Sequence, residues 1–189
     1  MALIIGTPHS DVLTGTDGAD VVFGFSGADF IAGGEGDDAI FAGPGSDTLV
    51  GGVGVDTLIG GPGADVFRFG WVREPSATSF VLDSGVGAGN RDVVLDFRQG
   101  QDKLDLSGYE NIFARPGVPS EPVFLGTDPF GASIAPQVRY VVEDGYTLVQ
   151  VDTTLGNPPS HVEPRPGPNV EIKLVGEYQL RLDDFILSA

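Results

Sequence analysis

The stretch GGEGDDAIF, residues 33–41, joins three glycines and two adjacent aspartates to an apolar ending. Glycine at this density opposes helix formation, because it loses more backbone entropy on folding than any other residue. The first half of the stretch therefore predicts a tight turn, and the second half predicts a β-strand. Such a turn has no apolar side chains to hold it, so it needs contacts from neighbouring segments.

The same pattern recurs every nine residues on both sides of this stretch. Seven consecutive units fill residues 6–68 without an insertion. Their sixth position is always aspartate: Asp11, Asp20, Asp29, Asp38, Asp47, Asp56 and Asp65. Their eighth position is always a large apolar residue: Leu13, Val22, Ile31, Ile40, Leu49, Leu58 and Phe67. A period this strict identifies an internal repeat, and the fold has to be predicted from how the units stack.

Each unit predicts one turn followed by one short strand. Positions seven to nine are β-prone, and the two-residue alternation of a strand points position eight to one face. Two units then form one coil, and successive coils stack about 4.8 Å apart. We therefore predict an all-β fold, a right-handed parallel β-roll over residues 1–69, with the position-eight side chains in its thin interior.

The predicted roll brings the aspartates into two columns, one from the odd units and one from the even units. Carboxylates about 5 Å apart repel one another by roughly 1 kcal/mol in water and by more at a lower effective dielectric. The turns also direct backbone carbonyls into the gap between coils. Carboxylate and carbonyl oxygens suit Ca²⁺, which takes about six to eight oxygen ligands, better than Mg²⁺, which demands a tight octahedron. The sequence therefore predicts that calcium holds the turns.

The composition supports a cation-binding protein. The formal net charge is −17, and residues 1–67 contain ten acidic residues but no Lys or Arg. Such a surface disfavours nucleic acid and anionic lipid as partners. The chain has no cysteine for a disulfide or thiolate site, and two histidines, His9 and His161, are too few for most zinc sites.

Several function classes lack their sequence signals. No apolar run is long enough for a membrane span, and MALIIG is too short for the apolar part of an N-terminal secretory signal. The motifs HExxH and GxSxG and a cysteine nucleophile are also missing. We therefore predict that this chain is not an enzyme.

The repeat resembles the RTX (repeats-in-toxin) calcium-binding nonapeptide, and all seven units match it. The resemblance implies that each calcium lies between units i and i+2. The earlier unit supplies its aspartate and the carbonyls of positions two and four, and the later unit supplies its aspartate and the carbonyls of positions one and three. Besides the seven aspartates, the implied ligands are Thr7, His9, Thr16, Gly18, Gly24, Phe25, Ser26, Gly27, Gly33, Gly34, Glu35, Gly36, Ala42, Gly43, Pro44, Gly45, Gly51, Gly52, Val53, Gly54, Gly60, Gly61, Pro62 and Gly63.

Some of these units depart from the pattern. The first unit has Thr7, Pro8 and His9 where glycines are expected, so its site is the weakest match. The side chains of Asp17, Glu35 and Asp37 occupy variable positions, and we expect them to be solvated. Glu35 then contributes only its backbone carbonyl.

After Phe69 the period ends, and residues 70–189 predict a β-sandwich-like cap. Asp144-Gly145 is the turn of a clear β-hairpin. The other expected features are a loop-rich connection over residues 70–91 and strands within residues 92–109, 138–152, 169–176 and 178–187.

The resemblance continues into this half. GADVFRF (63–69) followed by DVVLDFRQGQDKLDLSG (92–108) resembles the end of the roll and the cap in serralysin-type metalloproteases and in the R-modules of alginate epimerases. It implies that Asp92 and Asp102 close a last calcium site, with Glu74 where the family often has aspartate. The alternative is that both aspartates only end strands. The total implied is about five to seven calcium ions.

The ending LDDFILSA (182–189) resembles a C-terminal type I secretion signal, an acidic residue followed by a short apolar run. It implies export to the extracellular space by a bacterial ABC transporter, and it is compatible with a final buried strand. Two functions then remain. One is a calcium-triggered folding and secretion module. The other is a module that binds an acidic polysaccharide, or an adhesin or matrix module. For the second, the cations available near the cap are Arg68, Arg73, Arg91, Arg98 and Lys103, which form either a basic patch or ordinary ion pairs.

Overall fold

The computed structural model describes residues 1–73, 80–82, 84, 85, 87, 89–109, 122–131, 135–153 and 170–188. Within these ranges the chain forms β-strands and one short 3₁₀ helix, η1 (Leu182–Asp184). The strands are β1 (Leu3–Ile5), β2 (Val12–Thr14), β3 (Val21–Phe23), β4 (Phe30–Glu35), β5 (Ala39–Phe41), β6 (Thr48–Val53), β7 (Thr57–Ile59), β8 (Val66–Arg73), β9 (Phe80–Leu82), β10 (Asp92–Val94), β11 (Lys103–Gly108), β12 (Val123–Phe124), β13 (Gln137–Glu143), β14 (Tyr146–Asp152), β15 (Val170–Val175) and β16 (Phe185–Ile186). A helix with the length and apolarity of a membrane span does not occur in the described residues.

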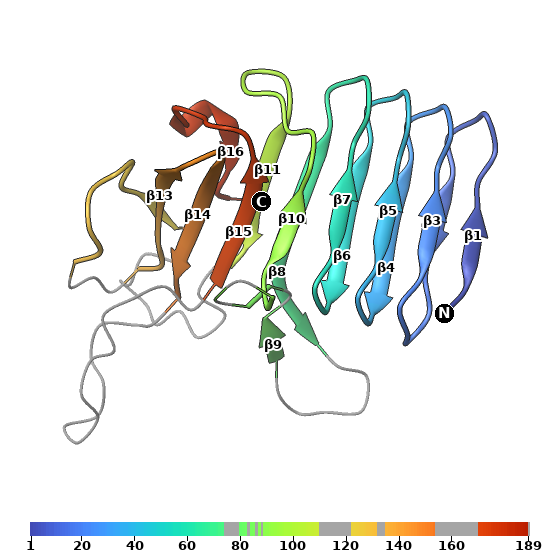
Figure 1. Ribbon diagram of the computed structural model, residues 1–189, viewed down its shortest axis with the longest axis horizontal. Coiled ribbons are helices and arrows are strands. Elements are labelled where there is room, and N and C mark those ends of the chain that lie inside the picture. Colours follow the sequence, from blue (N-terminus) through green and yellow to red (C-terminus); the bar gives the residue numbers. More distant parts are fainter. Residues whose placement is uncertain are drawn as a thin grey trace.

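The repeats form two facing parallel sheets. Sheet A begins β1-β3-β5-β7, and sheet B runs β2-β4-β6-β8, so that the strands alternate between the sheets along the chain (Figure 1). Equivalent residues of alternate units pair directly, as Val22 does with Ile40 and Ile31 with Leu49. This confirms the predicted all-β fold and the parallel β-roll with two units per coil.

The interior of the roll is the row of position-eight side chains. Six of them are completely buried: Val22, Ile31, Ile40, Leu49, Leu58 and Phe67. At the N-terminal end Leu13 is only partly buried, because no further coil covers it among the described residues. One large buried side chain per nine residues is a thin core, so apolar burial alone gives the turns little support.

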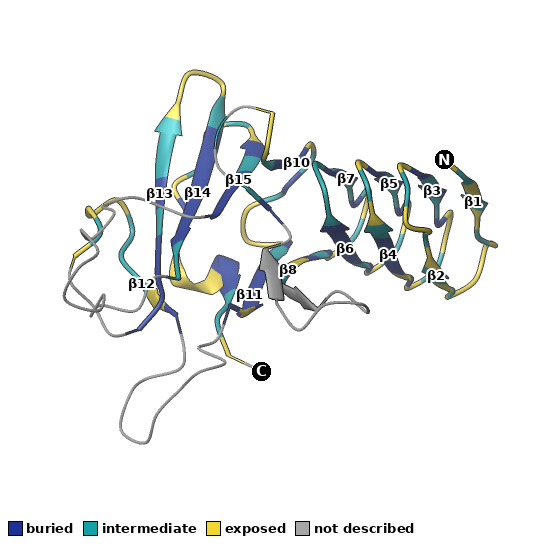
Figure 2. Cartoon of the chain, turned by 90° about the horizontal axis from the view of Figure 1, so that it is seen from below, coloured by how far each residue is buried: buried dark blue, intermediate teal, exposed yellow. Residues whose placement is uncertain are grey.

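The cap continues both sheets of the roll. Strand β10 pairs with β7 in sheet A, where Val94 lies beside Leu58, and β11 pairs with β8 in sheet B, where Leu104 lies beside Phe67. Sheet A then extends through the antiparallel strands β15, β14 and β13, while β16 pairs with β11. Figure 2 shows that buried residues run on from the roll into β11, β14 and β15. The cap therefore adds a further coil to the roll before it turns antiparallel.

Two segments differ from the sequence prediction. The expected loop over residues 70–91 contains the end of β8 and the strand β9, which pair antiparallel, Trp71 opposite Leu82. Residues 178–187 form only the two-residue strand β16, because Asp184 accepts hydrogen bonds from the N–H groups of Gly100 and Arg181 and draws the chain into η1. The predicted hairpin is confirmed, with Glu143 opposite Tyr146.

Candidate calcium sites

The position-six aspartates form two hydrogen-bonded columns. In each pair the backbone N–H of one aspartate donates to Oδ1 of the aspartate 18 residues later, as Asp38 does to Asp56 at 2.8 Å. The other pairs inside the repeats are Asp11 with Asp29, Asp20 with Asp38, Asp29 with Asp47, and Asp47 with Asp65, at 2.7 to 2.9 Å. In this ladder, Oδ1 of each later aspartate accepts the N–H of the aspartate in the preceding coil. Their second oxygen is left for another partner.

In five of these aspartates the second carboxylate oxygen, Oδ2, accepts no hydrogen bond. Oδ2 is buried and unpartnered in Asp29, Asp38, Asp47, Asp56 and Asp65, and each of these residues is at most 3% exposed. A buried carboxylate oxygen without a partner costs more than a neutral polar group in the same place. A positively charged partner would stabilise these oxygens. The repeats cannot supply one from their own side chains, because no Lys or Arg occurs before Arg68.

Backbone carbonyls border the same spaces. A Cβ atom built on Gly33 would lie 2.3 Å from Oδ2 of Asp38 and 2.5 Å from the carbonyl oxygen of Gly51. A Cβ on Gly24 would likewise lie 2.5 Å from Oδ2 of Asp29 and 2.5 Å from the carbonyl oxygen of Ala42. Each glycine thus leaves open a small space lined by a carboxylate and a carbonyl of the next coil, which fits an oxygen-liganded cation.

Close stacking of the turns brings more backbone carbonyls to the side of the roll where the aspartates lie. Gly52 has φ 111° and Gly54 has φ 152°, and Cβ atoms on them would lie 2.0 Å from the carbonyl oxygen of Gly34 and 2.1 Å from that of Gly36. Only glycine permits both the backbone conformation and the approach. The carbonyl of Val53 accepts the N–H of Gly36 at 2.7 Å and keeps a second lone pair. In the described part of the chain no three acidic or imidazole side chains converge, so a cation here depends on these carbonyls.

The metal-free columns resist ionisation. Burial, with repulsion from neighbouring aspartates, raises the pKa of Asp38 to about 6, that of Asp56 to about 7 and that of Asp65 to about 6. Burial also raises the pKa of Asp47 and Asp102. A cation bound between the coils would reverse these shifts, because an opposite charge favours the ionised form.

Comparison with known proteins identifies the repeats. The family model of the RTX calcium-binding nonapeptide repeat, which contains four copies, matches residues 5–40 and again residues 41–71. Residues 5–71 are RTX calcium-binding nonapeptide repeats. The predicted resemblance is therefore confirmed, and calcium is the cation that RTX repeats bind.

One solved structure extends the likeness over the cap. The solution structure of the AlgE6R2 subunit of the Azotobacter vinelandii mannuronan C5-epimerase is 28% identical to this chain, with a TM-score of 0.54, and the match covers 98% of this chain and 92% of that chain. The AlgE6R3 subunit of the same enzyme is 24% identical with a TM-score of 0.31, over 96% and 80% of the two chains. No curated protein matches the chain.

The first two RTX units differ from the others. In these units a threonine at position two donates to the aspartate of its own unit: Thr7 N and Oγ1 lie 2.6 and 2.9 Å from Oδ2 of Asp11, and Thr16 N and Oγ1 lie 2.7 and 2.8 Å from Oδ2 of Asp20. Burial pushes the pKa of Asp20 upward, but the bonds from Thr16 and Ala2 outweigh it, and the pKa is lowered.

Asp92 and Asp102 end different columns, which corrects the expectation that they close one site together. The N–H of Asp56 donates to Oδ1 of Asp92 at 2.8 Å, and the N–H of Asp65 donates to Oδ1 of Asp102 at 3.0 Å. The physical reason is that β10 joins sheet A and β11 joins sheet B. Oδ2 of Asp102 accepts the N–H of Arg98 at 2.7 Å. Glu74 lies outside the described residues.

Asp96 is a further contributor to this region that the repeat pattern does not predict. Its two carboxylate oxygens accept the N–H groups of Gly60 and Gly61 at 2.9 and 2.8 Å. One coil earlier these N–H positions donate to backbone carbonyls, as Ala42 does to Ile59. Asp96 therefore replaces main-chain acceptors where the last RTX turn meets the cap. The available signal was a second aspartate in DVVLDF, four residues after Asp92.

Of the two alternatives for the basic residues near the cap, a basic patch or ordinary ion pairs, the described contacts of Arg68, Arg91 and Lys103 favour ion pairs. Arg68 pairs with Asp105 on sheet B at 2.9 Å, and Lys103 bonds to the carbonyl of Asp183. Arg91 pairs with Glu171 on sheet A at 3.4 Å. The side chain of Arg73 lies outside the described residues.

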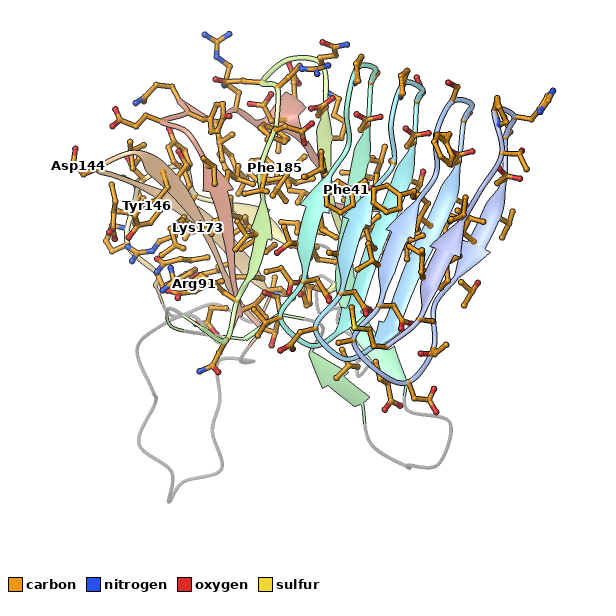
Figure 3. The ribbon with its side chains drawn as sticks, turned by 45° about the vertical axis from the view of Figure 1, so that its right-hand side comes forward. Phe41, Arg91, Asp144, Tyr146, Lys173 and Phe185 are labelled. Carbon is orange, nitrogen blue, oxygen red and sulfur yellow. The ribbon has the colours of Figure 1, made fainter. Side chains whose placement is uncertain are left out.

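Arg91 lies together with two other cations on sheet A of the cap, Arg139 and Lys173. Arg139 donates to Gln150 at 2.8 Å, Gln150 donates to Glu171 at 2.7 Å, and Arg91 pairs with the same Glu171. The ammonium of Lys173, two residues beyond Glu171, lies 4.6 Å from the ring centre of Tyr146. Figure 3 shows Arg91, Lys173 and Tyr146 on the same side of the cap. We call Arg91, Arg139 and Lys173 the cationic strip.

Proposed function

We propose that this chain is a calcium-triggered folding module that leaves a bacterial cell by type I secretion and then stabilises an extracellular protein. The observation that carries this proposal is the set of buried, unpartnered Oδ2 atoms of Asp29, Asp38, Asp47, Asp56 and Asp65. Without a cation, folding brings these carboxylates together and removes them from water. With calcium, the same atoms become ligands.

The magnitude of the calcium effect is large enough for a switch. A ligand that binds only the folded state stabilises it by about 1.4 kcal/mol per site at ten times its dissociation constant. Extracellular calcium modules have dissociation constants of roughly 0.1–1 mM. About five such sites contribute roughly 7 kcal/mol, which is comparable to the whole stability of a small domain. At the low free calcium of a cytoplasm this contribution is close to zero, so the chain stays unfolded and ready for export.

The C-terminal segment is the proposed transporter signal. In the folded chain it is held against the cap: Asp184 is 3% exposed and accepts from Gln99 and Gly100, and Phe185 is 8% exposed and packs on Phe124. Because β16 pairs with β11, which itself extends sheet B of the roll, folding buries Asp184 and Phe185 of the segment. We propose that the transporter binds it before calcium folds the chain.

One experiment tests this function as a whole. The full chain is expressed in a host with a type I transporter, and the secreted protein is compared in medium with calcium and in medium with excess chelator. We expect export in both media but a protease-resistant roll only with calcium. Export of a chain that is already folded inside the cell would contradict the proposal.

A second candidate function is binding of an anionic polysaccharide by a non-catalytic module. It is favoured by the 28% identity with the AlgE6R2 subunit along 98% of this chain and by the cationic strip on sheet A. Calcium loading also offsets much of the net charge of −17. The test is binding of an anionic glycan by the calcium-loaded protein, with Lys173→Gln as the variant and Arg68→Gln on sheet B as the control. Loss of binding in the first variant alone supports this function, and no binding by the unaltered protein excludes it.

A further inference from the structure

We infer that Thr7 and Thr16 take the place of calcium at the first two aspartates, so that the N-terminal turns of the roll close without a metal ion. The inference stands on the geometry of the repeats and goes beyond the proposed function, because it holds whether or not the protein is secreted. It concerns two of the seven units that otherwise match the RTX pattern.

The hydrogen bonds are the first observation. Oδ2 of Asp11 accepts both the N–H and the hydroxyl of Thr7, and Oδ2 of Asp20 accepts the same two groups of Thr16. A carboxylate oxygen has two lone pairs, so both acceptor positions of each Oδ2 are filled. The remaining oxygen of Asp20 accepts the N–H of Ala2. Neither Asp11 nor Asp20 belongs to the set with a buried, unpartnered oxygen.

The backbone supplies a second, independent observation. At position two the later units all have positive φ: Phe25 72°, Gly34 113°, Gly43 103°, Gly52 111° and Gly61 95°. Thr7 and Thr16 do not. A β-branched residue strongly disfavours positive φ, so threonine selects a different turn conformation, in which its own N–H points at the aspartate. The choice between threonine and glycine at one position therefore decides whether the carboxylate is open to a cation.

The consequence is a smaller number of calcium ions. The sites expected between Asp11 and Asp29 and between Asp20 and Asp38 each lack an open Oδ2 on the earlier aspartate. Three sites remain within the repeats, at Asp29 with Asp47, Asp38 with Asp56, and Asp47 with Asp65. The cap adds up to two, where Asp56 and Asp65 meet Asp92 and Asp102. We therefore expect about three to five ions, fewer than the five to seven implied by the pattern alone.

The test is to give the first two units the glycine of the later ones. In Thr7→Gly/Thr16→Gly the full chain should bind two more calcium ions than the unaltered protein, counted by native mass spectrometry and by titration against a calcium-binding dye. The matched control is Thr14→Gly, which makes the same change at an exposed threonine of the first unit that lies in β2 and outside the turn. Its ion count should equal that of the unaltered protein.

Each result decides the matter. A gain of two ions in the double variant alone supports the inference, and a gain of one overturns it for the unit whose site stays empty. An unchanged count overturns it for both units. If the double variant does not fold, a crystal structure of the unaltered protein grown in calcium decides instead. Calcium between Asp11 and Asp29, or between Asp20 and Asp38, would contradict the inference, and threonine hydrogen bonds there would support it.

Discussion

The backbone N–H of Asp56 donates to Oδ1 of Asp92 at 2.8 Å, although the two residues are 36 positions apart, twice the spacing inside the repeats. The cap thus enters the aspartate column as if it were one more coil. Asp65 and Asp102 repeat the relationship on the other edge. The two aspartate columns of the roll therefore continue into both sheets of the cap.

Asp38→Asn tests the role of a column member. Its Oδ1 accepts the N–H of Asp20 and its Oδ2 is open, so the variant weakens the ladder and removes a charged ligand. We expect the calcium midpoint of folding to rise on the order of tenfold, measured by circular dichroism. Asp17→Asn changes an exposed side chain of a neighbouring turn and is the control. Equal midpoints for the two variants would contradict the assignment of Asp38.

Phe25→Gly should stabilise the calcium-loaded roll. Phe25 has φ 72°, which is unfavourable for a bulky residue, and its side chain is 51% exposed, so little packing is lost. We expect a gain of about 0.5–1 kcal/mol in the free energy of unfolding, after the greater entropy of glycine in the unfolded chain is counted. Urea unfolding at saturating calcium measures it. Ser26→Gly, at a residue without positive φ, should lower stability instead.

Acidification should oppose calcium. The pKa of Asp56 is raised to about 7 and those of Asp38 and Asp65 to about 6, whereas the unfolded value is near 3.9. The metal-free roll therefore binds more protons than the unfolded chain, and its stability falls as pH rises through this range. Calcium has to displace these protons, so its midpoint should increase as the pH is lowered from about 8 to 6. Calorimetry in buffers of different ionisation enthalpy should detect proton release, and a pH-independent midpoint would argue against protonated columns.

Removal of residues 183–189 should abolish export by a type I transporter. The segment carries the acidic and apolar residues of the proposed signal, and no other part of the chain is proposed to replace it. Secretion is measured in a host with the transporter, and calcium-dependent folding of the purified truncated chain is measured in parallel. Retained folding with lost export separates a signal from a structural role. Normal export of the truncated chain would refute the signal.

The nine-residue period was enough to predict the roll, because a strict repeat sets the register of every strand. The same regularity predicted the columns and the buried row of position-eight residues. It did not predict the closed turns of Thr7 and Thr16, because the difference lies in the backbone conformation that threonine selects. It also did not predict that Asp92 and Asp102 belong to different columns. The segments that connect the repeats to these two residues have no period from which their positions could be predicted.

The hydrogen bonds that Asp96 accepts from Gly60 and Gly61 could not be predicted from the repeat either. Its side chain replaces backbone carbonyls, so no repeat position marks it. The strand expected within residues 178–187 is longer than the observed β16. Asp184 holds the preceding residues in a turn through contacts with Gln99 and Gly100, which lie more than 80 residues earlier. Contacts between distant segments decided both cases, and local sequence patterns do not report them.

The central claim is that calcium and folding of the roll are one event, and a calcium titration of the full chain followed by circular dichroism tests it most directly. We predict a cooperative transition from coil to β-structure at roughly 0.1–1 mM calcium, reversed by a chelator and not reproduced by magnesium. Complete β-structure in excess chelator at neutral pH would contradict the account.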